Sequence, residues 1–244
     1  MNPEAQSDTG VPPVIDDSTS DTGVPPVIDD STSDTGVPPV SHFVPMRADD
    51  KIEKRRRNLP HWEQNECTYF VTYRLADSLP GSKLAELREE KENWKRQHPE
   101  PWTPQTKKDF YLFFNRRIER WLDSGFGSCL LKTRDVREIV EGSLTFFHGK
   151  RYNLDCYVVM PDHVHVLVRP FRDCPLSGIL HTWKSFSAHR MNRLLKAFGC
   201  IWMDEYFDHI VRSERQLDRF REYIASNPER AGLSCEHFGF QALI

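Results

Sequence analysis

Two histidines separated by one residue, His163 and His165, are the side chains of this sequence best suited to hold a metal ion. They lie in the segment Met-Pro-Asp-His-Val-His-Val-Leu-Val at residues 160–168. On a β-strand, alternation would put both histidines and Leu167 on one face and the valines on the other. Side chains two apart on a strand lie roughly 6.5–7 Å apart, so two neutral imidazoles can reach one ion. We therefore predict half of a metal site on this strand.

A helix near the end of the sequence offers the missing groups. The run Ser-Glu-Arg-Gln at residues 213–216 has the form of a capping box, which starts a helix. We expect Pro228 to end this helix, since the residue before a proline is driven out of the helical region. Tyr223 and Asn227 are four residues apart, so they share one face of the last turn. A phenol beside an amide oxygen supplies a nucleophile and a third metal ligand.

Taken alone, each residue has a plainer interpretation, because a strand histidine or a helical tyrosine usually only packs. Together they resemble a known family, the single-tyrosine HUH transposases, and within it the REP-associated tyrosine transposases. The matching stretches occur in the family's order at residues 157–168 (YVVMPDHVHVLV), 202–213 (WMDEYFDHIVRS) and 223–233 (YIASNPERAGL). The similarity runs from about 55 to 233 and is weakest through a helical insertion at about 81–128.

The resemblance implies a role for each candidate. His163 and His165 would be metal ligands and Tyr223 the nucleophile, while Asn227 stands where related enzymes carry a polar third ligand. Two imidazoles and an amide oxygen with open positions suit Mg²⁺ or Mn²⁺. The family cleaves and rejoins single-stranded DNA at palindromic hairpins through a 5′-phosphotyrosine, which leaves a free 3′-hydroxyl. We expect hairpin single-stranded DNA as the partner, and a monomer.

Basic residues at three places are candidates for DNA contact. The resemblance implies that a basic segment before the first strand reads DNA beside the hairpin, and Arg55, Arg56 and Arg57 are the candidates there. A helix expected at 176–197 carries Lys184 and Arg193, and no acidic residue lies between 174 and 203. A solvated helix surface explains those two residues equally well. Arg212, just before the tyrosine helix, completes the set: Arg55, Arg56, Arg57, Lys184, Arg193 and Arg212.

The expected elements favour one architecture. They are a strand at 67–74, helices at about 82–97, 104–122 and 133–148, strands at 152–160 and 163–169, a helix at 176–197, a short strand within 201–212 and the tyrosine helix. This order suits a ferredoxin-like α+β fold, an antiparallel sheet with helices on one face. The resemblance implies the same HUH endonuclease fold, with the tyrosine helix laid across the sheet.

Residues 1–46 differ from the rest of the sequence. The 13-residue unit SDTGVPPVIDDST at 7–19 repeats at 20–32, and a third copy begins at 33. Its polar, Pro- and Gly-rich composition cannot bury enough apolar surface to offset ordering entropy. We expect a disordered acidic tail at 1–46 and the transposase-like domain at 47–240.

Charge and composition narrow the functional class. Residues 1–46 hold eight acidic residues and no Lys or Arg, so a formal net charge of −3 for the whole leaves +5 on residues 47–244. A mildly basic domain is compatible with a phosphate-bearing partner. No apolar run approaches the roughly 20 residues of a membrane span, and no charged-then-apolar leader opens the sequence. With six cysteines lacking metal spacing, we expect a cytoplasmic protein with reduced thiols, associated with the nucleoid when bound to DNA.

Three other interpretations remain open. The chain could be a non-catalytic DNA-binding protein derived from such a transposase, although the tyrosine and both histidines are present. A histidine phosphoesterase would need a third histidine at 167, where Leu167 stands. A purely structural ferredoxin-like domain would leave the histidine pair and the tyrosine helix as unrelated coincidences.

Overall fold

A five-stranded antiparallel sheet forms the centre of the molecule. The computed structural model describes residues 43–45, 53–56, 60–64, 66–122 and 124–243. Within them the sheet has the order β6-β3-β5-β4-β7. Its strands are β3 (Tyr69–Arg74), β4 (Tyr152–Val159), β5 (His163–Pro170), β6 (Phe207–Ile210) and β7 (Gly239–Ala242). A separate two-stranded sheet pairs β1 (Glu53–Arg56) with β2 (Pro60–Glu63).

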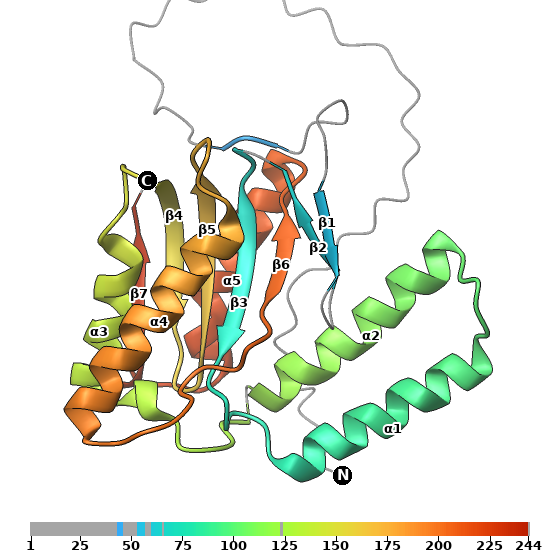
Figure 1. Cartoon of the computed structure of the whole chain (residues 1–244), viewed down its shortest axis with the longest axis horizontal. Coiled ribbons are helices and arrows are strands. Elements are labelled where there is room, and N and C mark those ends of the chain that lie inside the picture. The colour runs from blue at the N-terminus through green and yellow to red at the C-terminus, as the bar shows by residue number, and fades with distance from the viewer. Residues whose placement is uncertain (1–42, 46–52, 57–59, 65, 123, 244) are drawn as a thin grey trace, which may run out of the picture.

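The helices are arranged around this sheet in three groups. α3 (Arg134–Thr145) and α4 (Leu176–Leu195) lie together on one face, and α5 (Glu214–Arg230) lies on the opposite face. α1 (Gly81–Gln97) and α2 (Pro104–Leu122) form a hairpin that projects from the sheet, and the C-terminal end of α2 returns to it (Figure 1). The chain order β3-α3-β4-β5-α4-β6 confirms the expected α+β class and ferredoxin-like sheet.

The prediction that the helices lie on one face holds for α3 and α4 but not for α5. The reason lies in β5, whose residues 163–168 are all buried. Val164, Val166 and Val168 pack in the cluster formed with α3 and α4. Leu167 faces the other way and packs with residues of α5. A strand that is buried on both faces needs cover on both, and α5 provides the second cover.

The tyrosine helix begins where the sequence predicted and ends later. The Ser213 hydroxyl accepts a hydrogen bond from the Gln216 backbone N–H at 3.2 Å, as an N-cap does. The expected stop at Pro228 is wrong, because α5 continues through it to Arg230. A proline in the last turn removes only one backbone donor, and the helix tolerates that loss near its end. Asn227 therefore lies inside the helix.

Most of the expected N-terminal tail lies outside the described residues, and so does Arg57. Residues 43–45, which the prediction placed in the tail, contact the folded part. The Val44 carbonyl accepts a hydrogen bond from the Thr68 N–H at 3.0 Å, and Phe43 packs against the apolar cluster beneath α5. Among the described helices, none has the length and apolar character required to cross a membrane.

Candidate active site

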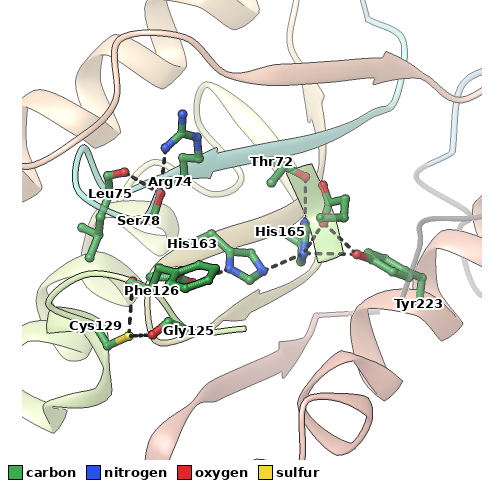
Figure 2. Close-up of polar contacts among 12 residues, drawn as sticks. Thr72, Arg74, Leu75, Ser78, Gly125, Phe126, Cys129, His163, His165 and Tyr223 are labelled. Atoms are coloured by element: carbon green, nitrogen blue, oxygen red, sulfur yellow. Dashed lines mark hydrogen bonds and ion pairs between the residues drawn. The ribbon is translucent and has the colours of Figure 1, made fainter. Parts of the chain in front are cut away.

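The two histidines of β5 meet on the sheet face covered by α5. Their Nε2 atoms lie 3.0 Å apart, and their rings are nearly perpendicular, with centroids 4.6 Å apart. Figure 2 shows His163 and His165 side by side on β5, with the hydroxyl of Tyr223 pointing toward His165. The strand alternation therefore placed both imidazoles as predicted.

Each histidine is held through its other ring nitrogen. His163 Nδ1 lies 2.7 Å from Asp162 Oδ1, and His165 Nδ1 lies 2.7 Å from the Thr72 hydroxyl. Thr72 is the register partner of His165 across the β3–β5 ladder, so the two side chains share one face of the sheet. Such contacts fix the ring orientation of metal-binding histidines and leave Nε2 for the ion.

The surroundings keep His165 neutral. Its ring is fully buried and stacks on Phe70, with centroids 5.5 Å apart. Burial, reinforced by the neighbouring His163, lowers the pKa of His165 well below its ordinary value. At neutral pH the ring therefore carries no charge and can offer a nitrogen lone pair to a cation.

Helix α5 brings Tyr223 to the histidines. Phe220, one turn earlier, stacks on Phe70 with centroids 4.4 Å apart and seats the helix on the sheet. The Tyr223 hydroxyl then lies 3.5 Å from His165 Nε2. The Arg230 guanidinium, two turns further along, lies 5.6 Å from the centre of the phenol ring. The predicted nucleophile and histidine pair thus form one constellation, although they come from distant segments.

A further member of the site, Glu119, was not indicated by any sequence pattern. This carboxylate belongs to α2, inside the segment read as an insertion, and its Oε2 accepts a hydrogen bond from the Tyr223 hydroxyl at 3.1 Å. The same oxygen lies 3.8 Å from His165 Nε2. No motif or fixed spacing ties Glu119 to the histidine strand. Glu119 is recognised as part of the site only because α2 returns to the sheet.

The donor set fits a divalent cation. Glu119, His163 and His165 each offer a ligand atom, and these atoms lie within 4.8 Å of one another. Octahedral ligands at 2.0–2.1 Å from an ion are about 3 Å apart, which matches the separation of the two Nε2 atoms. Asn227 is 1% exposed, and its Oδ1 finds no hydrogen-bond partner among the described residues. A buried amide oxygen without a partner is a feature of an uncompleted site.

The residues expected to contact DNA are spread over the molecule. Lys184 and Arg193 lie on α4, which covers the sheet face opposite the histidines. The Lys184 ammonium donates a hydrogen bond to the Asp204 carbonyl at 2.7 Å. Arg55 and Arg56 belong to β1, and Arg212 is an exposed residue just before α5. The five described candidates therefore belong to three separate parts of the chain.

Comparisons with known proteins find a similarity over part of the chain. Residues 131–227 match the family model described as transposase, IS200-like. A search of curated proteins finds no match. Among solved structures, a REP-associated tyrosine transposase bound to a REP hairpin is 17% identical, covers 75% of each chain and has a TM-score of 0.36. A candidate transposase from Deinococcus radiodurans is 15% identical, covers 71% of this chain and 97% of its own, and has a TM-score of 0.29.

Both structural matches have TM-scores below 0.5, and the family similarity is carried by the sequence match over residues 131–227. The matched segment begins before α3 and ends in α5, and it includes His163, His165 and Tyr223. Residues 131–227 of this chain are therefore similar to transposases of the IS200-like family.

Proposed function

We propose that this transposase cleaves and rejoins single-stranded DNA, with Tyr223 as the nucleophile and a divalent cation at His163 and His165. The observation that carries the proposal is the approach of the Tyr223 hydroxyl to within 3.5 Å of His165 Nε2, beside the facing Nε2 pair. A nucleophile and a pair of imidazoles at one buried point constitute the parts needed for metal-assisted phosphoryl transfer.

The covalent step exchanges one phosphoester bond for another. The Tyr223 oxygen bonds to phosphorus, the bond from phosphorus to the 3′ oxygen breaks, and the phenol proton passes in net terms to the departing 3′ oxygen. DNA downstream of the cut stays on the enzyme as a 5′-phosphotyrosine. The upstream strand keeps a free 3′-hydroxyl, which can later attack the phosphotyrosine, so rejoining needs no nucleotide cofactor.

The metal-binding side chains have separate tasks. Asp162 and Thr72 orient the two imidazoles, and the Asn227 amide oxygen is the further ligand that the sequence resemblance implies. Bound Mg²⁺ or Mn²⁺ supplies Lewis-acid stabilisation of charge on the phosphoryl oxygens. Tyr223 is only 2% exposed. DNA can therefore reach its hydroxyl only after the residues that pack over the site move apart.

The substrate class follows from the sequence resemblance to REP-associated tyrosine transposases. We propose imperfect hairpins of single-stranded DNA as the substrate and an enzyme that acts as a monomer. Arg55, Arg56, Arg57 and Arg212 remain predicted DNA contacts. Lys184 and Arg193 remain predictions too, for a DNA segment that passes over α4 on the far face of the sheet.

A covalent-adduct assay tests the proposed function. Hairpin single-stranded DNA labelled at its 3′ end is incubated with the protein and Mn²⁺ or Mg²⁺, and a denaturing gel is scanned for protein-linked label. The 3′ label should remain on the protein, whereas a 5′ label should be released with the upstream strand. Tyr223→Phe should abolish the adduct, because the variant keeps the ring and loses the attacking oxygen.

Tyr157→Phe is the matched control for this assay. Tyr157 is a buried tyrosine that packs in the cluster of α3 and α4, on the other face of the sheet, so its variant should form the adduct normally. An adduct formed by Tyr223→Phe would refute the assignment of the nucleophile. Specific hairpin binding without any adduct in the wild type would instead favour a DNA-binding protein that does not cleave.

A further inference from the structure

We propose that Glu119 is a protein ligand of the catalytic cation, supplied by the inserted α1–α2 hairpin, so that metal binding fastens this hairpin to the sheet. The inference rests on the proposed function, because it concerns the same metal site. It adds a ligand from a part of the chain that lies outside the residues matched by the transposase family model.

The Glu119 carboxylate lies close to both histidines. Its Oε2 lies 3.8 Å from His165 Nε2, and its ligand atom falls with those of both histidines inside a span of 4.8 Å. These separations leave the Glu119 carboxylate close enough to be a further ligand of an ion bound by both Nε2 atoms. The carboxylate also accepts the hydrogen bond of the Tyr223 hydroxyl, which keeps the nucleophile beside the same point.

A carboxylate also supplies negative charge that the other candidate ligands lack. An imidazole that binds a metal through a lone pair and an amide oxygen carry no formal charge, so without a carboxylate the ligands would leave the whole charge of a divalent ion uncompensated in a buried site. Burial of an ion is costly unless an opposite charge or good ligands accompany it. Mg²⁺ and Mn²⁺ also prefer carboxylate oxygen among protein ligands. Glu119, itself 5% exposed, is the carboxylate in the Glu–His–His group found among the described residues.

The α1–α2 hairpin packs mainly within itself. Its apolar side chains form a cluster of their own, which includes Leu87, Phe114 and Trp121 and is separate from the two clusters that pack on the sheet. The hairpin is therefore a semi-independent unit that reaches the catalytic face through the end of α2. A cation shared by Glu119 and the histidines would join this unit to β5.

Mn²⁺ binding measured without DNA tests the ligand assignment. Free Mn²⁺ is followed by electron paramagnetic resonance for the wild type, Glu119→Gln, Glu119→Asp and His163→Ala. Glutamine can still accept the Tyr223 hydrogen bond, so a merely structural Glu119 would tolerate this change. As a ligand, Glu119→Gln should weaken Mn²⁺ binding at least about tenfold, and Glu119→Asp should retain more affinity than glutamine does. Glu89→Gln, an exposed residue of α1 with the same change in charge, should bind Mn²⁺ like the wild type.

Hydrogen exchange tests the attachment of the hairpin. Mn²⁺ should slow amide exchange in the C-terminal half of α2 and in β5 of the wild type. In Glu119→Gln, excess Mn²⁺ should still protect β5 but no longer α2. The inference is overturned if Glu119→Gln binds Mn²⁺ as tightly as Glu89→Gln while His163→Ala loses binding, or if Mn²⁺ leaves α2 exchange unchanged in the wild type. The proposed function is tested separately, because it is refuted if the wild type forms no covalent adduct at Tyr223 in the DNA assay.

Discussion

The imidazoles of His163 and His165 present Nε2 to the same point because both Nδ1 atoms are already engaged. One contacts the Asp162 carboxylate and the other the Thr72 hydroxyl. With Nδ1–H donated to a carboxylate, the His163 Nε2 carries the lone pair that a metal requires. Asp162 is 1% exposed, so water does not compete with the ring for the carboxylate oxygen that contacts it.

Replacing Asp162 by asparagine should weaken metal binding without removing a ligand. An amide can present its NH₂ group to Nδ1 and thereby favour the tautomer with hydrogen on Nε2, so we expect about a 10- to 100-fold loss of Mn²⁺ affinity. Titration calorimetry of the purified protein measures it. Asp173→Asn is a suitable control, because Asp173 is exposed and its backbone lies in the left-handed region, which asparagine tolerates. Equal affinity of Asp162→Asn and the control would show that this contact does not tune the site.

At the level of elements, α5 is aligned on the sheet by an ion pair as well as by apolar packing. The Arg221 guanidinium donates two hydrogen bonds to the Asp155 carboxylate, at 2.9 and 2.6 Å. Asp155 sits at an irregularity of β4, where the register with β5 shifts between Leu154 and Cys156. A β-bulge re-aims the side chain of its extra residue. Here it aims the carboxylate at the helix that carries Tyr223.

Arg221→Ala should loosen this helix. The Asp155 side chain is only 10% exposed, so removal of its partner leaves a poorly solvated carboxylate, and we expect a loss of about 1–2 kcal/mol in the free energy of unfolding. Urea denaturation followed by circular dichroism measures this loss. Arg215→Ala, an exposed position on the same helix, should change stability by less than about 0.5 kcal/mol. Similar losses in both variants would mean that the Arg221–Asp155 ion pair contributes no more to the free energy of unfolding than an exposed arginine does.

Over the whole molecule, the two faces of the sheet have different roles. The face under α3 and α4 is an apolar core that includes the tyrosines Tyr73, Tyr152 and Tyr157. The face under α5 also contains the histidines and Tyr223, so the chemistry lies on one side and most of the packing on the other. Burial raises the pKa of Tyr73, Tyr152 and Tyr157 above the ordinary value.

These tyrosines should make the protein sensitive to alkaline pH. In the unfolded chain the phenols lose their protons near pH 10, whereas in the folded chain they keep them to higher pH. The folded state then binds more protons, so stability should fall as pH rises above about 10. Urea midpoints near neutral pH and at about pH 11 measure the effect.

Tyr73→Phe should reduce this alkaline loss. The Tyr73 hydroxyl is buried and finds no hydrogen-bond partner among the described residues, so its removal should leave stability near neutral pH unchanged or raised by about 1 kcal/mol. In Tyr157→Phe, by contrast, the hydrogen bond to Gln241 is lost, and some stability should be lost near neutral pH. An alkaline loss as large in Tyr73→Phe as in the wild type would exclude Tyr73 as a cause.

The amino-acid sequence by itself determined the features that have a local period. Alternation with period two put His163 and His165 on one face of a strand, and helical spacing put Tyr223 and Asn227 on one face of a helix. The same periods predicted the order of strands and helices and hence the fold class. Such patterns are legible because each depends only on residues a few positions apart.

Only the tertiary structure decided which distant groups meet. The register of β3 against β5 put Thr72 beside His165, and the burial of both faces of β5 placed α5 opposite α3 and α4. The return of α2 to the sheet brought Glu119 to Tyr223. These contacts follow from strand register, packing of layers and loop closure. Those depend on the free energy of the whole fold, and no local spacing in the chain encodes them.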